Sequence, residues 1–397
     1  MYDLKIFAEL IEPTAVNQIY ETVSKPPFVG AKVRIMPDAH AGIGSVVGFT
    51  STLTDKVIPC VIGVDIGCGM LTASLGKTEV DFKALDDFIK SEIPSGNAVS
   101  DDCDGKEFVD KLLCKDRLRD LPRLYGSLGT LGGGNHFIEI DRGKNENYLV
   151  IHSGSRNLGL QVAKIYSKKA VDYCKNAPLE ERERIISELK GKGEVAAIPD
   201  ALKALTEKYK DRTKLPPEYC FLEGEGMSAY MHDMRICQDF AVRNRKKMCD
   251  KIMKFLKIGK FDYFETVHNF IDDEGIIRKG AVPAHKGQKL IIPMNMKDGC
   301  LICEGLGNPD WNFSAPHGAG RLYSRSEAKR KFTVEEFQTE MKGIFTTTAN
   351  ASTIDESPMA YKPTESIVNA IGDTVKILSV VKPVYNFKAA DLSDGDK

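Results

Sequence analysis

The stretch Val64-Asp65-Ile66-Gly67-Cys68-Gly69-Met70 is the point from which both the fold and the site of this chain can be worked out. It places a carboxylate and a thiol three residues apart in a glycine-rich loop, so that both can reach one cation. A thiolate can also bridge two metal ions, while a carboxylate adds a hard oxygen ligand. Taken alone, the same loop is also typical of a buried structural cysteine beside a turn aspartate.

Four further short segments group histidine with Asn, Glu, Ser or Arg, and flanking glycines in most of them let the backbone approach a ligand closely. These segments are Gly132–Glu139, Ile151–Arg156, Val267–Asn269 and Pro316–Arg321. A fold that uses histidine only as core filler would not be expected to group it in this way. The five segments together predict one composite metal and nucleotide site, gathered from distant parts of the chain.

The segment around His136 combines three kinds of ligand group. Three glycines precede Asn135 and His136, which suits a strand-edge turn whose N–H groups face an anion. His136 offers a ligand nitrogen, Asn135 a hydrogen bond to phosphate, and Glu139 an acceptor pair for the N1/N2 edge of guanine. The alternative is a hairpin turn that carries an ordinary histidine.

The remaining histidines of the clusters follow or precede chemically useful neighbours. His152 follows an apolar strand and precedes Arg156, whose guanidinium suits bidentate phosphate binding. His268 also ends a strand, and for both histidines the alternative is a hydrogen-bonded side chain at a strand end. His317 is followed directly by Gly318–Arg321, an arrangement that leaves an imidazole over a phosphate nest and suits a nucleophile.

Composition excludes several classes of protein. The 397 residues allow one large domain or two ordinary ones, and 42% hydrophobic with 28% charged residues is typical of a globular protein. No apolar signal segment or transmembrane run is visible, and ten cysteines without regular spacing favour reduced thiols in the cytoplasm. A net charge of −1 excludes a basic nucleic-acid coat but allows a locally basic groove. The basic cluster Arg243–Lys247 is interpreted as a solvated helix face.

Strands and helices do not alternate regularly along the chain, which favours an α+β fold over a doubly wound sheet. Periodicity and turn residues predict helices over 81–92 and 230–256, a charged helical insertion over the core from 161 to about 210, and a final helix and strand after Pro363. They predict strands over 31–36, 57–64, 148–151, 261–267 and 289–303, and loops over 37–42 and 65–69.

Other candidate motifs do not support a function. Cys300 and Cys303 have redox-like spacing, but they lie in an apolar strand run that sends the two thiols to opposite faces. No Walker A sequence and no complete Rossmann glycine pattern occurs. The histidines outside the clusters are expected to have supporting or structural roles: His40, His232 and His285.

Five ordered motifs resemble the RtcB family of RNA ligases, and the resemblance runs from Met36 to about Lys388. The motifs are Pro37–His40, Gly63–Met70, Gly133–Phe137, His152–Arg156 and His317–Arg321. The resemblance implies one RtcB-like α+β domain over residues 1–397, with mixed and antiparallel sheets around a central dimetal site and a charged helical insertion at about 161–215.

The resemblance also implies an activity. Members of the family use GTP to join an RNA 3′-phosphate or 2′,3′-cyclic phosphate end to a 5′-hydroxyl end, in tRNA splicing or RNA repair, and an archease-type protein is a candidate activator. Two manganese ions would share Cys68, one with Asp65 and His136, the other with His152 and His268. The guanylylated nucleophile would be His317, with Arg156 and Arg321 near the phosphates.

The nucleotide contacts that the resemblance implies are Asn135, His136, Phe137, Ile138, Glu139, His268, Asn269, Pro293, Met294, Asn295, Met296, Cys300, His317, Gly318, Ala319, Gly320 and Lys388. This chain departs from the family in the turn that starts at Pro293, where the family usually carries a small Gly-Ser or Gly-Thr pair. Cys300 also stands in place of a serine that contacts guanine. These differences predict weaker GTP binding and favour a paralogous RNA-repair branch.

Two other functions fit part of the pattern. A dimetal phosphoesterase that opens 2′,3′-cyclic phosphates without ligation needs the metal ligands but has no use for a nucleophilic histidine. A catalytically silent protein that binds RNA ends would be expected to lose a metal ligand, and none is lost here. His317 therefore discriminates the ligase from the phosphoesterase.

Overall fold

The computed structural model describes residues 2–389. The strands are β1 (Asp3–Ile6), β2 (Lys32–His40), β3 (Val47–Thr52), β4 (Lys56–Val57), β5 (Gly69–Gly76), β6 (Phe137–Arg142), β7 (Asn147–Ser153), β8 (Leu222–Glu223), β9 (Tyr263–Val267), β10 (Asn269–Ile271), β11 (Ile276–Lys279), β12 (Ala281–Pro283), β13 (Lys289–Asn295), β14 (Gly299–Gly305), β15 (Ser314–Pro316) and β16 (Val375–Lys388).

The α-helices are α1 (Pro13–Val23), α2 (Pro59–Ile62), α3 (Phe82–Glu92), α4 (Lys106–Val109), α5 (Leu121–Tyr125), α6 (Arg156–Gly191), α7 (Ile198–Thr213), α8 (Gly224–Phe255), α9 (Arg325–Lys331), α10 (Val334–Glu340) and α11 (Thr364–Ala370). The 3₁₀ helices are η1 (Pro26–Phe28), η2 (Lys115–Arg117), η3 (Val195–Ala197), η4 (Pro217–Tyr219), η5 (Pro309–Trp311), η6 (Ala351–Glu356) and η7 (Pro358–Ala360).

The largest sheet has seven antiparallel strands in the order β13-β14-β16-β6-β7-β5-β9. Strand β7 lies inside the sheet between β6 and β5 and reads Tyr-Leu-Val-Ile before His152, and such a β-branched and aliphatic run is typical of a strand buried on both faces. The register sets His152 opposite both Met70 on β5 and Phe137 on β6. It thereby brings the segments that hold Cys68 and His136 to the same end of the sheet.

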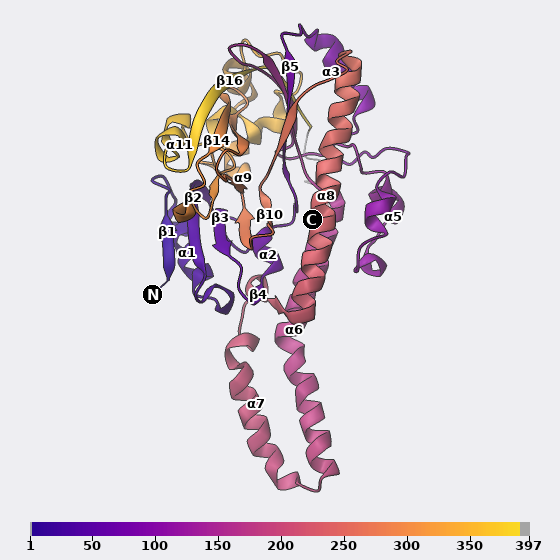
Figure 1. The fold of residues 1–397 in the computed structure, drawn as a ribbon, viewed down its shortest axis with the longest axis vertical. Helices are drawn as coiled ribbons and strands as arrows, with labels where there is room; N and C mark the ends of the chain where they lie inside the picture. Colours follow the sequence, from indigo (N-terminus) through magenta and orange to yellow (C-terminus); the bar gives the residue numbers. More distant parts are fainter. Residues whose placement is uncertain (1, 390–397) are drawn as a thin grey trace.

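A second sheet is mixed, with the order β1-β2-β3-β11-β10. β1 pairs with β2 in parallel, and the other pairs are antiparallel. The large sheet and this smaller one stand beside the long helix α8 (Figure 1). Since strands of both sheets and separate helices coexist without regular alternation, the predicted α+β class is confirmed.

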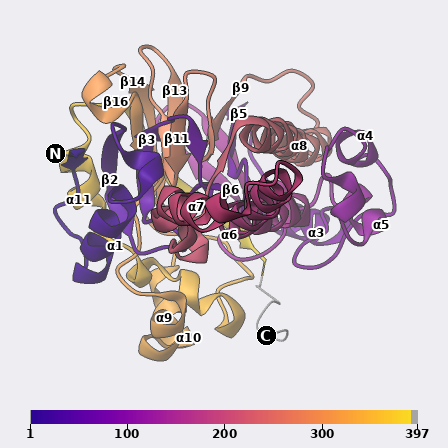
Figure 2. The ribbon, with the colours of Figure 1, turned by 90° about the horizontal axis from the view of Figure 1, so that it is seen from below.

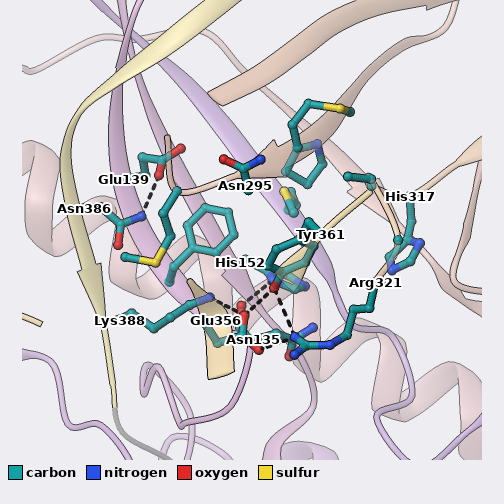
Figure 3. A pocket seen from close by; sticks show the side chains of 18 of the residues that line it. Asn135, Glu139, His152, Asn295, His317, Arg321, Glu356, Tyr361, Asn386 and Lys388 are labelled. Atoms are coloured by element: carbon teal, nitrogen blue, oxygen red, sulfur yellow. Dashed lines mark hydrogen bonds and ion pairs between the residues drawn. The ribbon is translucent and has the colours of Figure 1, made fainter. Parts of the chain in front are cut away.

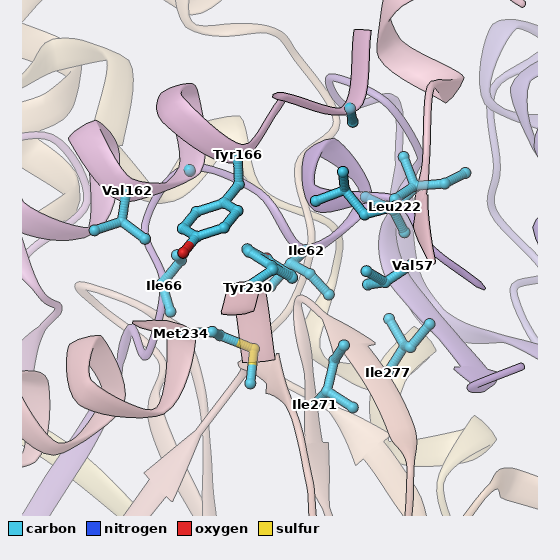
Figure 4. Packing of buried hydrophobic residues seen from close by; sticks show 14 of the residues in the cluster. Val57, Ile62, Ile66, Val162, Tyr166, Leu222, Tyr230, Met234, Ile271 and Ile277 are labelled. Carbon is cyan, nitrogen blue, oxygen red and sulfur yellow. The ribbon is translucent and has the colours of Figure 1, made fainter. Parts of the chain in front are cut away.

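Helix α8 forms where the sequence predicts a helix over 230–256, and it begins six residues earlier. Its apolar positions at helical spacing, among them Met234, Phe240 and Met248, are buried. The main hydrophobic core lies where α8 and α6 face the strands, with Tyr166, Tyr230 and Met234 in contact with aliphatic side chains (Figure 4). Two polar residues of α8, Asn244 and Arg245, are also fully buried, so the prediction that 243–247 is a solvated helix face is wrong for both.

Helices α6 and α7 form an antiparallel hairpin that extends away from the rest of the molecule (Figure 1), instead of covering the core as predicted. Figure 2 looks at this hairpin from its tip. Glu181 on α6 forms an ion pair with Lys208 on α7 at 3.0 Å, and many other charged side chains face solvent. Charged residues suit a hairpin that has water on most sides.

Two predicted elements near the N-terminus are wrong. The segment 57–64 is predicted as a strand, but only Val57 is in one, and Pro59 occupies the first turn of the short helix α2. Proline lacks the N–H that a sheet requires and fits the first turn of a helix. The predicted loop over 37–42 is mostly the end of strand β2. Helix α1 was not predicted.

The helix predicted over 81–92 is confirmed as α3. The Asp81 side chain caps the start of this helix by accepting a hydrogen bond from Ala84 N at 3.0 Å. The final helix and strand after Pro363 are confirmed as α11 and β16. Cys300 and Cys303 pack into different hydrophobic clusters, as predicted for opposite faces of one strand. Among the residues that the structure describes, no helix combines the length and the apolar character needed to cross a membrane.

Candidate active site

A cavity of about 230 Å³ opens at the end of the large sheet where His152 lies (Figure 3). Its wall includes most of the predicted nucleotide contacts: Asn135, Phe137, Glu139, Pro293, Met294, Asn295, Met296, His317, Gly318, Ala319, Gly320 and Lys388. The catalytic candidate Arg321 and the metal-ligand candidate His152 also line it. Segments separated by more than 200 residues therefore form one cavity.

Cys68 lies at the centre of a cluster of predicted metal ligands. Its Sγ is 3.2 Å from His152 Nε2 and 3.4 Å from His136 Nε2. The thiol and both imidazoles are at most 4% exposed. Among the described residues, Cys68, His136 and His152 offer three ligand atoms within 4.8 Å of one another, a spacing that suits one divalent transition-metal ion.

Backbone carbonyls orient both imidazoles toward the thiol. His136 Nδ1 is 2.9 Å from Leu131 O, and His152 Nδ1 is 3.0 Å from Asn135 O. A carbonyl accepts only from a protonated nitrogen, so each ring carries a proton on Nδ1 and turns Nε2 toward the thiol. Burial holds the pKa of His152 well below its usual value, which keeps this imidazole neutral. Neutral imidazole is the form that binds a metal.

Asp65 and His268 complete the predicted ligand set. Asp65 Oδ2 is 3.0 Å from His136 Nε2, and although burial raises the pKa of Asp65, its hydrogen bond and charge interaction with His136 lower it to about 2. The His268 ring centroid lies 5.2 Å from that of His152, and burial holds its pKa well below the usual value. Gly154 permits this packing, since a Cβ there would lie 2.1 Å from Asp65 Oδ1.

The protonation state of the Cys68 thiol depends on whether a metal ion is bound. Burial, together with the nearby carboxylate of Asp65, raises its pKa well above the usual value, so the thiol is protonated when no metal is bound. A divalent ion would displace this proton, because a coordinating thiol is deprotonated. The donor set thus fits a metal and also implies that metal binding releases a proton.

His317 is oriented by a carboxylate that the sequence analysis did not identify. Its Nδ1 is 2.7 Å from Asp38 Oδ2, and its backbone N–H donates to the same oxygen at 3.2 Å. Asp38 is fully buried near the end of β2, whereas the His317 side chain is 18% exposed and lines the cavity. Because a carboxylate accepts the Nδ1 proton, the lone pair of His317 is on Nε2.

The Glu139 carboxylate lies at one end of the cavity in Figure 3. Its Oε2 accepts a hydrogen bond from Asn386 Nδ2 at 2.5 Å. Cys300 is not in the cavity wall; it is buried behind Glu139, with Sγ 3.9 Å from Oε1. Ile138 points to the other face of β6 and packs in the hydrophobic core.

Lys388 belongs to a charged network on another side of the cavity. Its Nζ donates to Glu356 at 2.6 Å, and Arg321 Nη1 donates to the other oxygen of the same carboxylate at 3.1 Å. The Tyr361 hydroxyl also donates to Glu356 (Figure 3). Arg325 forms a further ion pair with Glu356. One buried carboxylate therefore orders three cations around the cavity.

Asn269 and Arg156 lie outside the main cavity. Asn269 Nδ2 donates to Asp65 O at 3.1 Å, and its Oδ1 accepts from Gly280 N at 2.9 Å, so its amide supports the loop that carries the candidate ligands Asp65 and Cys68. Arg156 Nη1 lies 3.1 Å from His136 Nδ1. It lines a second cavity of about 270 Å³, whose wall shares Asn135 with the first cavity and includes Asp65 and His136.

Two buried residues of α8 fix the loops that carry the ligands. Arg245 Nη1 donates to Gly67 O at 3.0 Å and to Ser153 O at 2.8 Å, while its Nε donates to Glu265 at 2.7 Å. The Asn244 side chain donates to Gly154 O at 3.1 Å and accepts from Gly129 N at 2.7 Å. These bonds tie the loop before β5 to the end of β7.

Comparison with known proteins agrees with this geometry. The family model described as tRNA-splicing ligase RtcB matches residues 18–121 and 107–389. The chain belongs to the RtcB family. It is 28% identical to the RNA-splicing ligase RtcB of Escherichia coli K12, over 95% of each chain. It is 27% identical to the tRNA-splicing ligase RtcB of Aeropyrum pernix, over 85% of this chain and 84% of that protein.

Membership of the RtcB family explains why separate motifs meet in one cavity, but three partners in this site were missed by the sequence analysis. Asp38 was noticed only as part of a motif, and neither Glu356 nor Asn386 has a local signature. Each becomes visible only through its contact with His317, Lys388 or Glu139. A buried acid opposite a histidine or a lysine leaves no pattern in the sequence when the two are far apart.

Proposed function

We propose that the protein is a GTP-dependent RNA ligase that joins an RNA 3′-phosphate or 2′,3′-cyclic phosphate end to a 5′-hydroxyl end, in tRNA splicing or RNA repair. The observation that carries the proposal is the pairing of His317 with buried Asp38 at 2.7 Å, in a cavity that also contains His152 of the Cys68 cluster. The family and the names of its relatives support RNA as the substrate.

The metal in this proposal is manganese, with two ions per chain. Asp65, Cys68 and His136 would hold one ion, and Cys68, His152 and His268 the other. When bound, divalent manganese supplies positive charge that neutralises the phosphates of the substrates. Thiolate and imidazole ligands suit manganese better than magnesium, which prefers oxygen.

The chain's own residues account for the first chemical step. Asp38 holds the Nδ1 proton of His317, and the Nε2 lone pair attacks the α-phosphorus of GTP. A phosphorus–nitrogen bond forms, the bond to the bridging oxygen breaks, and pyrophosphate leaves. The carboxylate also stabilises the positive charge that develops on the imidazole.

The next two steps return the histidine and seal the RNA. An oxygen of the RNA 3′-phosphate attacks the guanylyl phosphorus, which breaks the bond to His317 and leaves the RNA end activated as an anhydride. The 5′-hydroxyl oxygen then attacks the RNA phosphorus, a phosphodiester forms, and GMP leaves. A 2′,3′-cyclic phosphate must first be opened by water. Lys388 and Arg321 line the cavity and would balance phosphate charge.

The guanine base is proposed to bind Glu139. A carboxylate offers two acceptors to N1–H and N2–H, and Asn386 holds one oxygen in position. Met294, Asn295 and Met296 line the cavity at the turn where the family usually carries a small Gly-Ser or Gly-Thr pair. The Asn295 amide donates to Asp298 at 2.9 Å, so this turn is itself fixed by hydrogen bonds.

Incubation with α-labelled GTP and manganese, followed by a denaturing gel, tests the proposal. We expect covalent label in the wild type and none in His317→Ala, with equal label in the matched control His232→Ala, whose imidazole is half exposed on α8. Unlabelled wild-type protein that still opens a cyclic phosphate would establish the phosphoesterase instead. Repeating the assay with an archease-type protein tests whether an activator is needed.

A further inference from the structure

Two carboxyl groups and a thiol are buried together behind the guanine end of the cavity. Glu139 and Asp141 are two residues apart on β6 and therefore face the same side of the sheet. Cys300 on β14 lies next to them, and ligand atoms of all three are within 4.8 Å of one another. Their exposed fractions are 2%, 0% and 1%.

The two carboxyl groups differ in their hydrogen bonds. Glu139 accepts from Asn386 on β16, whereas Asp141 faces only Glu139 and the Cys300 thiol and accepts no hydrogen bond from any other described residue. The groups that face the pair are Cys300 on β14 and Asn386 and Lys388 on β16. Lys388 is already paired with Glu356, so within residues 2–389 no cation is dedicated to the two acids.

Two buried carboxylates this close cannot both be ionised at low cost. Burial raises the pKa of both groups, and repulsion from Asp141 raises that of Glu139 further. The pair therefore holds one proton at neutral pH. When the proton is on Asp141, the Asp141 carboxyl group can donate it in a hydrogen bond to Glu139. The ionised Glu139 then accepts from two donors, Asn386 and Asp141. An ionised Asp141 would have no donor other than Glu139 and Cys300.

The location of the proton determines which base the cavity fits. Guanine presents two donors, N1–H and N2–H, which require an ionised Glu139. Adenine presents an acceptor at N1 and a donor at N6, which fit a protonated Glu139. To bind adenine, the shared proton would have to move from Asp141 to Glu139, which would then donate it to adenine N1. Asp141 would be left ionised and buried without a donor for its charge, and burying such a carboxylate costs free energy.

We propose that Asp141 is a specificity-determining residue that retains the shared proton and thereby keeps Glu139 an acceptor that selects guanine over adenine. The inference rests on the proposed GTP site. Asp141 does not touch the base in this scheme; it acts through Glu139 as a positioning residue. Cys300 is compatible with this role, because burial and the two acids raise the pKa of its thiol well above the usual value and keep it neutral.

Equilibrium binding of GTP and ATP to the full-length protein between pH 6.5 and pH 8.5 tests the proposal, with Asp141→Asn and Asp141→Ala as the variants. The amide that the first substitution introduces is a permanent neutral donor, so Asp141→Asn should bind GTP within about twofold of the wild type at each pH. Asp141→Ala removes a hydrogen bond to a charged group, so GTP should bind about tenfold more weakly at pH 6.5. Part of this loss should be recovered at pH 8.5, as Glu139 ionises, whereas ATP affinity should not fall.

Tighter GTP binding by Asp141→Ala at pH 6.5 would overturn the proposal, because it would mean that Asp141 is ionised and repels the carboxylate. Unchanged GTP binding by Asp141→Ala would also overturn it. Loss of a bound metal ion from Asp141→Asn would show that the three groups hold a cation instead of a proton. Failure of the wild type to bind GTP would instead refute the proposed function, so the two failures are distinguishable.

Discussion

At the scale of single residues, Asp38 determines what His317 can do. Its carboxylate accepts the Nδ1 proton at 2.7 Å and fixes the imidazole that lines the cavity. Asp38→Asn removes the charge and offers an amide N–H in place of an acceptor, which favours the wrong tautomer. We expect covalent guanylylation to slow by about 10²- to 10⁴-fold, with GTP affinity changed little. A rate equal to that of the wild type in a labelling time course would show that Asp38 has no such role.

Cys68 is the residue on which both metal positions are expected to depend. Its Sγ lies within 3.4 Å of Nε2 of both His136 and His152. Metal analysis of Cys68→Ala should therefore show a loss at both positions, larger than in His152→Ala or His268→Ala. Retention of two ions per chain would contradict a bridging thiolate. In the wild type, manganese should support more guanylylation than magnesium at equal concentration.

Much of the site could be predicted from local sequence, because its ligands lie in short glycine-rich segments. Cys68, His136 and His152 are brought together as expected. The acids that complete the site could not be predicted. Asp38 and His317 are 279 residues apart, and Glu356 and Lys388 meet from different elements. Burial that forces such acids to pair depends on the whole fold, and no short pattern records it.

At the scale of elements, α8 positions the loops that carry the candidate metal ligands, through a residue that the sequence analysis interpreted as a surface cation. Arg245 donates to carbonyls of both Gly67 and Ser153. Arg245→Lys keeps the charge but cannot make the same set of bonds, because the ammonium lacks the planar fork of arginine. We expect metal affinity to fall by about 10- to 100-fold.

The matched control on the same helix is Arg235→Lys. Arg235 is half exposed and pairs with Asp273, which is almost fully exposed, so its replacement should leave metal affinity unchanged. Equal losses from both variants, measured by titration with a metal-sensitive dye, would mean that α8 has no specific role in supporting the loops.

Helix η6 contributes the buried carboxylate of Glu356, which pairs with cations of the cavity wall. Burial alone would raise the pKa of Glu356, but Lys388, Arg325 and Arg321 hold it well below the usual value. A depressed pKa in the folded state stabilises the protein above the unfolded pKa of about 4.3, and this contribution is lost as pH falls through the folded value. Glu356→Gln should therefore lower the free energy of unfolding by about 3–5 kcal/mol at pH 7.

The difference in unfolding free energy between the wild type and Glu356→Gln should narrow below about pH 4, where the wild-type carboxylate begins to lose its advantage. Urea unfolding curves at pH 7 and pH 3.5 measure this difference directly. A difference that stays constant between the two pH values would show that the charge on Glu356 does not stabilise the fold.

Elements with a regular apolar period were predictable, and elements set by a proline or by sheet pairing were not. The 3.6-residue period identified α3 and α8, and the Asp81 cap marked the start of α3. The β-branched run at 57–64 has the composition of a strand, yet Pro59 begins a helix there. Asp38 and His40 lie in β2 because the sheet extends through residues that have turn-like composition.

At the scale of the whole molecule, the outer part of the α6–α7 hairpin, residues 185–204, contributes no side chain to either cavity of the site. It projects from the body (Figure 1), and no predicted site residue lies between positions 185 and 204. Replacing residues 185–204 with a short Gly-Ser turn keeps the base of the hairpin, where the Arg212 guanidinium is 3.6 Å from the Tyr173 ring centroid. We expect covalent guanylylation within about twofold of the wild type, since surface changes away from the site cost little.

Ligation of RNA ends should be measured on the same shortened protein. We expect the shortened protein to ligate RNA ends at the wild-type rate, as it is expected to do for guanylylation. A loss of guanylylation, with melting unchanged, would contradict the independence of the hairpin and the site.

The strand order of the large sheet makes its closure depend on the synthesis of β16. β16 is the last strand along the described chain, yet it lies inside the sheet between β14 and β6. A nascent chain that stops before β16 has two separate half-sheets with unpaired edges, and such edges favour aggregation. It also lacks Lys388, which β16 contributes to the cavity. The large sheet therefore cannot close until β16 has left the ribosome.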